Sequence, residues 1–336
     1  MKAVGYPVSP PDRSVEHLVD LDLPRPVPAG RDILVRVEAV SVNPVDTKQR
    51  GPVDDPARLP RVLGFDASGT VEATGPDATL FHEGDAVFYA GAVNRQGSNG
   101  EWQLVDERLV ARKPATLDFA DAAALPLTAI TAWETLFDRF RIAPDREAAG
   151  SLLVIGAAGG VGSIATQLAR ELTSLTVIGS ASRDESRRFA LDHGCHHVVD
   201  HSRPMAPQLG ELGLPEIDYV FALTHTPEHM RDIGTLIRPF GQLCVIDSAE
   251  LDLAPIRTKS VSLHFEYMFT RPVFSTPDMI EQHRLLSEVA RLVDAGRIRS
   301  TRTRTLSPIS AERIREAHRL VEGGRTLGKT VIAGWR

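Results

Sequence analysis

The sequence predicts an α/β protein that combines a β-rich region with a parallel sheet covered by helices. In the first third of the chain, Ile33, Val35 and Val37 alternate with polar residues, which is the period of a half-buried strand. In the middle third, short apolar runs alternate with helical segments, as in the βαβ units of a parallel sheet. A glycine-rich stretch, 156–162, directly follows the first of these apolar runs, 151–155.

Composition and charge exclude several classes of protein. The chain has 336 residues, of which 42% are hydrophobic, enough for about two domains with cores of their own. No apolar run is long enough to cross a bilayer, and the N-terminus has no apolar signal core. The net charge of −6 argues against nucleic acid as a partner. With Cys195 and Cys244 as the two cysteines, a disulfide scaffold is excluded and we expect a cytoplasmic protein.

Residues 1–122 are expected to form the β-rich domain. Val71 and Ala73 repeat the alternation of apolar and polar residues after a glycine. Turn signals such as Asn43-Pro44 and Gly75-Pro76 separate the short predicted strands. This pattern is typical of an antiparallel barrel or sandwich.

Residues 123–264 are expected to form the parallel-sheet domain. Pro126 is suited to the first position of a helix, and apolar residues follow it at helical spacing. Further helices are expected up to about Leu172 and over 184–193. Strands are expected at 151–155, 175–179, 197–200, 217–223 and 242–247.

The last stretch, 265–336, is expected to hold two helices and a strand. Pro277 is predicted to open the first helix and Gly296 to stop it. Ser310 is predicted to cap the second helix. Residues 328–332 read as the final strand.

The glycine-rich stretch matches a G-x-G-x-x-G fingerprint with Ala157 in the first glycine position, followed by Gly159 and Gly162. Gly159 would let the backbone approach a pyrophosphate, and Gly162 would let the helix pack closely on the sheet. The free N–H groups of the first helical turn, which includes Gly160 and Val161, would bind the phosphates. Between a strand and a helix, this motif predicts a dinucleotide site. A tight glycine turn without a ligand is the alternative.

The end of the second strand bears on which dinucleotide is bound. A site for NAD usually has Asp or Glu here, which binds the ribose hydroxyls. In this chain the strand ends in Ser180-Ala181-Ser182-Arg183. Hydroxyl groups and a guanidinium suit the 2′-phosphate of NADPH, so we predict NADPH. The alternative is a solvated Arg183 with NADH bound.

These motifs resemble those of the medium-chain dehydrogenase/reductase superfamily, in its quinone oxidoreductase branch and close to its zinc-type alcohol dehydrogenase-like members. The resemblance spans nearly the whole chain and rests on VRVEAVSVNPVDTKQR (35–50), LGFDASGTVEATG (63–75), ALPLTAITAWETLF (124–137), LLVIGAAGGVGSIATQLAR (152–170), FGQLCVID (240–247) and GKTVI (328–332). It implies a GroES-like β-barrel catalytic domain, a Rossmann domain with a doubly wound parallel sheet, and a C-terminal return to the catalytic domain. It also implies NADPH in the cleft and a homodimer or homotetramer.

The same resemblance bears on zinc. Zinc alcohol dehydrogenases carry Cys near residue 43, Gly-His-Glu at 64–66 and a further four-Cys lobe. This chain has Asn43 and Gly64-Phe65-Asp66, with no cysteine between residues 85 and 115. Since catalytic zinc needs three protein ligands and structural zinc four, we expect no zinc. The His/Cys tract 193–201 could bind a metal on composition alone, but by resemblance it belongs to the nucleotide domain, with His201 near the adenosine.

Without zinc, the cofactor carries the hydride and the protein supplies orientation and electrostatics. Quinones and α,β-unsaturated carbonyls accept hydride readily, and the oxyanion that forms needs hydrogen-bond donors. The candidate catalytic residues are Asn43, Thr47, Lys48 and Tyr89, with Asp66 as a buried partner that holds the loop 43–50. By resemblance, Asn43 and Thr128 lie beside the nicotinamide, and four further residues contact the cofactor: Phe240, Gly241, Phe269 and Lys329.

We therefore expect an NADPH-dependent reductase of a small quinone, enal or enone. An enoyl-thioester reductase of the same superfamily is an alternative. Those relatives use a tyrosine in the loop that follows the segment matching residues 43–50, and this chain has none between Arg50 and Gly64. A non-catalytic NADPH-binding sensor or structural protein is a third possibility, because fold alone does not determine function.

Overall fold

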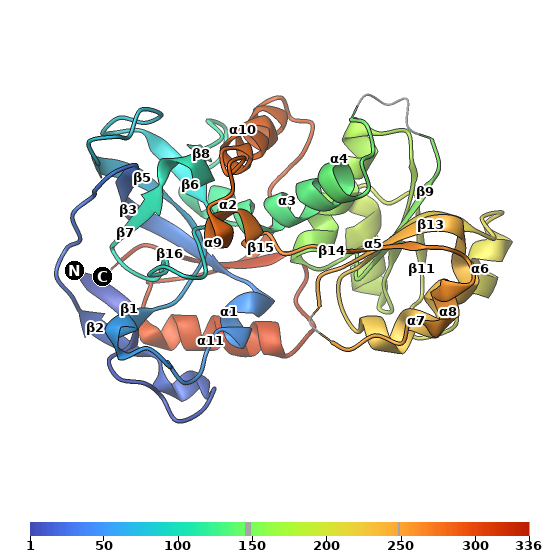
Figure 1. Ribbon diagram of the computed structural model, residues 1–336, viewed down its shortest axis with the longest axis horizontal. Coiled ribbons are helices and arrows are strands. Elements are labelled where there is room, and N and C mark those ends of the chain that lie inside the picture. The colour runs from blue at the N-terminus through green and yellow to red at the C-terminus, as the bar shows by residue number, and fades with distance from the viewer. Residues whose placement is uncertain (145–148, 248, 336) are drawn as a thin grey trace. The chain divides into compact units, whose positions relative to one another are not determined.

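The computed structural model describes residues 1–144, 149–247 and 249–335. It divides into two compact units (Figure 1): unit 1 comprises Met1–Ile130 with Phe269–Arg336, and unit 2 comprises Thr131–Met268. The predicted boundaries, after residues 122 and 264, lie eight and four residues before the observed ones, which follow Ile130 and Met268. The first difference arises because helix α3 (Pro126–Trp133) starts in unit 1 and continues into unit 2.

Unit 1 is built on two sheets. The large sheet has the order β15-β16-β3-β5-β6-β8, with β7 also paired to β3, and the small sheet has the order β2-β1-β4. Apart from the parallel pair β15–β16, all pairings are antiparallel. The strands are β1 (Lys2–Tyr6), β2 (Val19–Asp22), β3 (Asp32–Val42), β4 (Arg61–Val62), β5 (Asp66–Thr74), β6 (Ala86–Tyr89), β7 (Trp102–Asp106), β8 (Val110–Arg112), β15 (Arg302–Leu306) and β16 (Lys329–Ala333).

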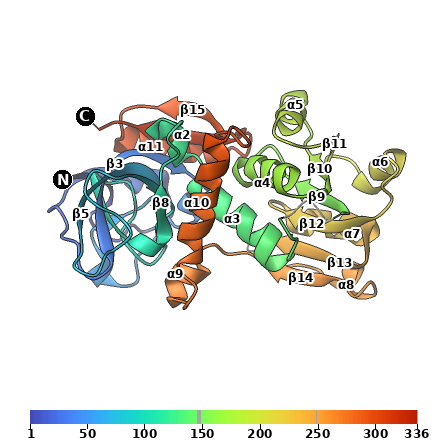
Figure 2. The same ribbon diagram turned by 90° about the horizontal axis from the view of Figure 1, so that it is seen from above.

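The C-terminal segment from Phe269 onward belongs to unit 1. Strand β16 lies antiparallel to β3, with Thr330 opposite Val42. The helices of this unit are α1 (Pro44–Lys48), α2 (Phe119–Ala123), α9 (Thr270–Phe274), α10 (Glu281–Asp294) and α11 (Ala311–Glu322). Figure 2 shows α10 standing beside β8, where the two elements are in contact.

The structure confirms the predicted start of α11 and the predicted end of α10, but the predicted start of α10 is wrong. Ser310 caps α11 by accepting the N–H of Arg313, and Gly296, with a φ of +68°, follows the end of α10. Pro277, however, does not open α10, which begins at Glu281. Pro277 lies in a turn in which the N–H of Met279 bonds to the carbonyl of Thr276, so the helical ladder starts later.

Unit 2 contains a six-stranded sheet in which every pairing is parallel. Its order, β11-β10-β9-β12-β13-β14, is the 3-2-1-4-5-6 order of a doubly wound fold. The strands are β9 (Ser151–Ile155), β10 (Thr176–Ser180), β11 (His197–Val199), β12 (Ile217–Ala222), β13 (Ile237–Val245) and β14 (Ser262–Phe265). The first four agree with prediction within about a residue, but β13 starts well before residue 242.

Helices cover both faces of this sheet (Figures 1 and 2). Helix α4 (Gly160–Leu172) follows β9, and α5 (Asp184–Asp192) follows β10. Helices α6 (Met205–Glu211), α7 (Thr226–Leu236) and α8 (Ala254–Arg257) share one apolar cluster with the inward side chains of the strands. A π-helical stretch, Glu134–Arg139, continues α3. Across the described residues, no helix has the length and apolar character needed to span a membrane.

Candidate active site

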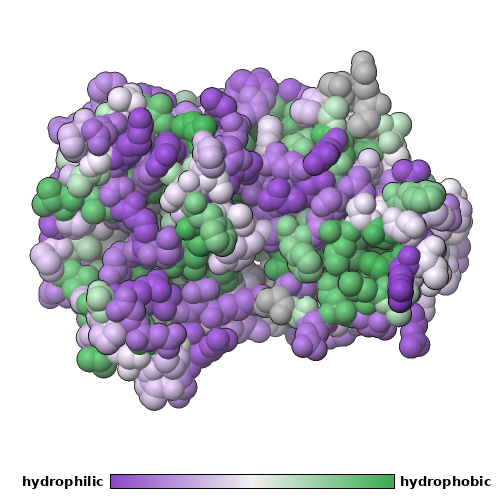
Figure 3. Space-filling model, viewed as in Figure 1, coloured by the Kyte–Doolittle hydropathy of each residue, from purple (hydrophilic) through white to green (hydrophobic). Residues whose placement is uncertain are grey.

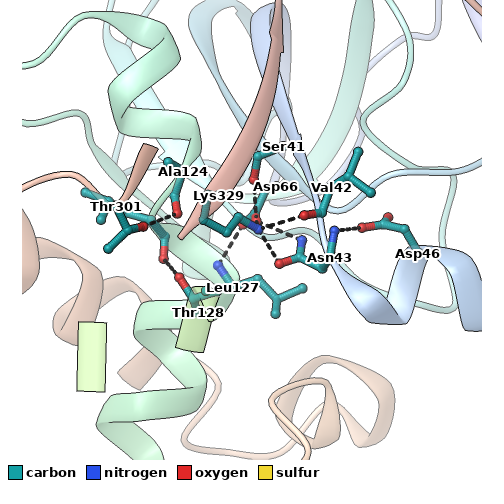
Figure 4. A network of polar contacts seen from close by, with 12 residues as sticks. Ser41, Val42, Asn43, Asp46, Asp66, Ala124, Leu127, Thr128, Thr301 and Lys329 are labelled. Atoms are coloured by element: carbon teal, nitrogen blue, oxygen red, sulfur yellow. Dashed lines mark hydrogen bonds and ion pairs between the residues drawn. The ribbon is translucent and has the colours of Figure 1, made fainter. Parts of the chain in front are cut away.

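The site in unit 1 begins where β3 ends and α1 starts. Asn43 is the N-cap of α1, and Pro44 occupies the first helical position, where its missing N–H costs nothing. The backbone N–H of Asn43 donates to Asp46 Oδ2 at 2.7 Å, as in a capping box. This arrangement fixes the backbone at Asn43 and directs its side chain toward β5 and β16 (Figure 4).

Asp66, the first residue of β5, lies at the centre of a buried hydrogen-bond network (Figure 4). Its side chain is 0% exposed. Oδ2 accepts hydrogen bonds from Ser41 Oγ at 2.8 Å, Asn43 Nδ2 at 2.8 Å and Lys329 Nζ at 2.9 Å. Oδ1 accepts the backbone N–H of Leu127 at 2.7 Å. Four donors on one carboxylate are suited to its charged form, because an ionised carboxylate only accepts.

Lys329, the first residue of β16, supplies the positive charge of this network. Its side chain is 3% exposed, and its ammonium donates to Asp66 Oδ2, to the carbonyl of Val42 at 3.2 Å and to Asn43 Oδ1. The register of β16 against β3 brings it there, because Thr330 pairs with Val42. The family resemblance predicts that Lys329 contacts the cofactor. In the structure, its N–H donors are directed to oxygens of the protein.

Asp46 is a second buried carboxyl group in the same place. Its side chain is 1% exposed, and Oδ1 has no hydrogen-bond partner among the described residues. Burial raises the pKa of Asp46 to about 7, although the N–H of Asn43 and the charge of Lys329 act in the opposite direction. The group is therefore divided between its neutral and charged forms near neutral pH.

Thr128 joins the site through helix α3. It is 2% exposed, and its hydroxyl donates to the carbonyl of Leu125 at 3.0 Å. Its neighbour Leu127 donates to Asp66, so the first turn of α3 is held against β5. Figure 4 shows Thr128 on α3 near Lys329 and Asp66.

Three of the predicted catalytic residues lie outside this network. The hydroxyl of Thr47 donates to the carbonyl of Pro44 at 2.8 Å, and Lys48 is exposed to solvent. Tyr89 lies in the apolar core of unit 1, with no partner for its hydroxyl in the described part of the chain. Burial raises the pKa of Tyr89 far above its usual value. Asn43 and Asp66 are the two predicted catalytic residues that the structure brings together.

Phe65 and Phe269 pack against each other next to the network. Their ring centroids lie 4.7 Å apart at an interplanar angle of 52°, and both side chains are buried. Phe65 comes directly before Asp66 and follows Gly64, whose φ is +98°. A Cβ at Gly64 would lie 2.6 Å from the side chains of Ser98 and Asn99, so the turn requires glycine.

The glycine-rich loop of unit 2 has the geometry of a phosphate cradle. Gly159 is the N-cap of α4, and a Cβ placed on it would meet nothing nearer than the carbonyl oxygen of Gly156 at 3.5 Å. A Cβ on Gly162 would instead lie 2.5 Å from that same oxygen and 2.6 Å from Ala157 Cα. Gly162 thus permits the close packing of helix on strand, and Gly159 leaves space beside the first turn of α4, where Gly160 and Val161 lie.

The residues that end β10 divide into buried and exposed groups. Ser180 is fully buried; its hydroxyl accepts the N–H of Gly156 at 3.1 Å and lies 2.9 Å from Nδ1 of His201. It therefore shapes the glycine loop from behind. Ser182 and Arg183 are exposed at the carboxyl end of the strand, and Arg183 is the N-cap of α5. His201 lies just beyond the carboxyl end of β11.

Phe240 and Gly241 do not lie where the sequence reading placed them. They form the irregular part of β13, between the pairs Ile217–Ile237 and Tyr219–Gln242 near the start of β12. The glycine loop follows the opposite, carboxyl end of β9, which is the edge at which doubly wound sheets bind their ligands. This geometry does not fit the expected contact of Phe240 and Gly241 with the cofactor.

The His/Cys tract has contacts of an ordinary structural kind. Cys195 is buried against β10, and burial raises the pKa of its thiol to about 12. His196 Nδ1 accepts the N–H of Val177 at 2.9 Å, and the ring of His193 stacks on Phe189. Across residues 1–144, 149–247 and 249–335, no three His, Cys, Asp or Glu side chains are grouped so as to hold a metal ion.

The sequence reading missed two members of the network, Ser41 and Asp46. Ser41 pairs with Asp66 in the register between β3 and β5, which a single sequence does not reveal. A signal for Asp46 was present, because Asn43-Pro44-Val45-Asp46 places a carboxylate three residues after an N-cap residue.

Comparisons with known proteins agree with this architecture. A family model described as alcohol dehydrogenase GroES-like domain matches residues 29–115, and one described as zinc-binding dehydrogenase matches residues 193–332. A zinc-type alcohol dehydrogenase-like protein of Staphylococcus aureus is 45% identical over 312 residues, covering 92% of each chain. Human quinone oxidoreductase is 29% identical over 322 residues, covering 93% of this chain and 92% of its own.

Solved structures show the same fold. A Rhizobium etli protein described as a candidate zinc-dependent alcohol dehydrogenase superposes with a TM-score of 0.95 at 53% identity, covering 100% of this chain and 98% of its own. Escherichia coli quinone oxidoreductase, solved in complex with NADPH, has a TM-score of 0.80 at 22% identity, covering 99% of this chain and 100% of its own.

Proposed function

The chain belongs to the medium-chain dehydrogenase/reductase superfamily, among the zinc-type alcohol dehydrogenase-like proteins and quinone oxidoreductases, and from that premise we propose that it is a zinc-independent, NADPH-dependent reductase. Its substrate class is a small quinone or an α,β-unsaturated carbonyl compound. Two buried free thiols, Cys195 and Cys244, support an assignment to the reducing cytoplasm.

The zinc-independent part of this proposal rests on the residue types of the network in unit 1. At the positions where zinc alcohol dehydrogenases have ligands, this chain has Asn43, Phe65 and Asp66. A phenyl ring offers no lone pair to a metal, and a buried ammonium, Lys329, is directed to the oxygens of the other two residues. A set of one amide, one carboxylate and a cation lacks the nitrogen and sulfur donors that zinc prefers.

The residues of unit 2 fit NADPH. The space beside Gly159 and the free N–H groups at the start of α4 would hold the pyrophosphate. Ser182 and Arg183 would hold the 2′-phosphate, since an exposed guanidinium can form a bidentate contact with it. His201, beyond β11, would flank the adenosine. Bound NADPH would supply the hydride.

In this proposal Asn43 polarises the substrate. Its Nδ2 group carries two hydrogens, of which one is donated to Asp66. The other would be donated to the carbonyl oxygen of the substrate, where negative charge develops as hydride arrives. Asp66 holds the amide in place, and the solvent supplies the final proton.

We also propose that the protein is a homodimer or homotetramer. Strand β14 is the last strand in the order of the sheet of unit 2. Phe240 and Phe265, which are 76% and 65% exposed, lie on this part of the sheet, and Figure 3 shows apolar side chains gathered near it. An exposed strand edge flanked by apolar side chains favours pairing with another chain. Light scattering after gel filtration measures the mass, and Phe265→Glu should lower it.

The test of function is NADPH oxidation by a simple quinone and by an enal, with protein that was treated with a chelator and with NADH in parallel. We expect turnover with NADPH that the chelator does not change. Loss of turnover after chelation, restored by zinc, would overturn the zinc-free proposal. NADPH binding without turnover of either substrate would favour a thioester substrate or a sensor.

A further inference from the structure

We propose that Lys329 is a positioning residue, whose ammonium group, together with Asp66, holds the Asn43 amide in the orientation that presents an N–H to the substrate carbonyl. The inference rests on the proposed function and adds to it a buried charge that acts without contacting the substrate. Its basis is four hydrogen bonds of the network in Figure 4, three donated by Lys329 and one donated by Asn43 to Asp66.

The ammonium group of Lys329 is directed to oxygens of unit 1. An ammonium group has three N–H donors and no acceptor. In this structure they are directed to three oxygens, the carbonyl of Val42 at 3.2 Å, Asp66 Oδ2 at 2.9 Å and Asn43 Oδ1. Contact with a cofactor or a substrate would require one of these bonds to break. We therefore infer that the charge of Lys329 orients side chains of the network and does not contact a bound cofactor or substrate.

The two neighbours of the Asn43 amide, Lys329 and Asp66, determine its orientation. Since an ammonium cannot accept a hydrogen bond, the end of the amide that faces Lys329 must be the oxygen. Since an ionised carboxylate cannot donate, the end that faces Asp66 must be the nitrogen, and Nδ2 lies 2.8 Å from Asp66 Oδ2. Rotating the amide by 180° would place N–H against the ammonium and C=O against the carboxylate. In a site where all three side chains are 3% exposed or less, neither mismatch is relieved by water.

Removing the charge of Lys329 changes the surroundings of the Asn43 amide. A neutral residue at 329 releases Asn43 Oδ1 and leaves Asp66 as a buried carboxylate without its cation. The amide oxygen of Asn43 then has no donor to face, and no ammonium is left to exclude the N–H end of the amide from that side. Both orientations of the Asn43 amide become available, so a share of the molecules no longer presents an N–H to the substrate.

The experiment compares Lys329→Met, Asn43→Ala and the double variant with the wild type. We expect Lys329→Met to lower kcat at least tenfold with either substrate, while the Kd of NADPH changes less than twofold. In the Asn43→Ala background the same substitution should have little further effect on kcat, because the residue through which Lys329 acts is gone. Lys259→Met is the matched control: this lysine of unit 2 donates to the backbone carbonyls of Thr235 and Ile237.

A second readout does not depend on turnover. In ¹⁵N-labelled protein the Asn43 side-chain amide is assigned by its disappearance in Asn43→Ala. We expect a pair of sharp, slowly exchanging resonances in the wild type, and broadened or faster-exchanging ones in Lys329→Met. If the wild type reduced neither a quinone nor an enal, the proposed function would fail, but this NMR comparison would still decide the role of Lys329.

Three results would overturn the inference. The first is an unchanged amide signal in Lys329→Met. The second is an equal loss of kcat from Lys329→Met in the presence and absence of Asn43. The third is a rise in the Kd of NADPH that accounts for the loss of activity, which would make Lys329 a cofactor contact instead.

If Lys329→Met is unstable, Lys329→Ala with added methylammonium replaces it. We expect methylammonium to restore part of the amide signal and part of kcat in Lys329→Ala. Tetramethylammonium, which has no N–H, should restore neither.

Discussion

Asp66 Oδ1 accepts the backbone N–H of Leu127 at 2.7 Å, and this bond joins strand β5 to the first turn of helix α3. The same carboxylate holds Ser41, Asn43 and Lys329 through its other oxygen. One buried side chain therefore connects β3, β5, β16 and α3, the elements from which the candidate site of unit 1 is built.

Replacing Asp66 with Asn should destabilise the protein strongly. The substitution leaves Lys329 as a buried cation without its counter-ion, and breaking such a pair costs about 3–5 kcal/mol. Urea unfolding measures the free energy of unfolding. Ser41→Ala is the control, since it removes one hydrogen bond and should cost about 1 kcal/mol. The double variant Asp66→Asn with Lys329→Met should recover part of the loss; no recovery would contradict the assignment of the cost to the unpaired charge.

The two glycines of the phosphate cradle should respond differently to alanine. A Cβ added at Gly159 would have space around it, and the φ of Gly159, −79°, is one that any residue can adopt. Gly159→Ala should therefore fold with a nearly unchanged Tm. The new methyl group would nevertheless occupy the approach to the pyrophosphate and raise the Kd of NADPH by roughly tenfold or more, a change of about 1.4 kcal/mol in binding free energy. At Gly162 the methyl group would collide with Gly156 and Ala157, so Gly162→Ala should lower Tm as well.

Thermal unfolding and fluorescence titration with NADPH test this pair of predictions. Gly210→Ala, on helix α6 with nothing within 4 Å of the added methyl group, is the control and should leave both quantities nearly unchanged. Equal effects of Gly159→Ala and Gly162→Ala on Tm would contradict the separate roles given to the two glycines.

Most of the sheet in unit 2 could be predicted from the sequence because its signals are local. The run 151–155 is apolar at every position, and β9 has these bounds and is buried throughout. Strand β14 (Ser262–Phe265) was missed although its polar and apolar residues alternate, because a strand of four residues is a weak signal and none of its side chains is fully buried. Strand β13 was expected to begin at residue 242, whereas in the structure it begins at Ile237 and includes an irregular stretch in which Phe240 has a φ of +61°.

The network of unit 1 could be predicted only in part. Asn43 was predicted as a hydrogen-bond donor that by resemblance lies beside the nicotinamide, and Asp66 as a buried partner that holds the loop 43–50. The position of Lys329 depends on the pairing of β16 with β3, two strands from opposite ends of the sequence, and no local pattern encodes such a register. Tyr89 was selected as a hydrogen-bond donor by residue type, but the alternation of β6 directs it into the apolar core.

The buried carboxyl group of Asp46 should make stability depend on pH. Its folded-state pKa, about 7, is above the ordinary value of 3.8, so folding takes up a proton between these values. The stabilisation is complete below about pH 4 and is lost as the pH rises through 7. Relative to Asp46→Asn, which mimics the neutral form, the wild type should lose roughly 2–4 kcal/mol between pH 4 and pH 8. Urea unfolding at several pH values measures this difference.

Asp54→Asn serves as the control for Asp46, because it makes the same chemical change at an exposed position. Its effect on the free energy of unfolding, measured at each pH, is subtracted from the effect of Asp46→Asn, so that the general effect of removing one carboxyl group is removed. If the difference between wild type and Asp46→Asn were also constant with pH, Asp46 would not titrate in the folded protein as its burial requires.

Arg183 should determine the preference for NADPH over NADH. It is exposed at the carboxyl end of β10, where the ribose of the adenosine half lies in doubly wound folds. Arg183→Asp replaces a cation with an anion that repels the 2′-phosphate, so the Kd of NADPH should rise at least tenfold, since a charged hydrogen bond contributes about 1.5–3 kcal/mol. The Kd of NADH should change little, because NADH has hydroxyls at that place.

Arg188→Asp is the matched control for Arg183→Asp: it makes the same change of charge at another exposed position of α5. If Arg183 contacts the phosphate directly, the control should raise the Kd of NADPH far less than Arg183→Asp does. A similar rise in both variants would mean that a change of charge anywhere on α5, and not the loss of a contact, weakens cofactor binding. If Arg183→Asp lost equal affinity for NADPH and NADH, Arg183 would not contact the 2′-phosphate. The selectivity for NADPH would then have to come from another residue of unit 2.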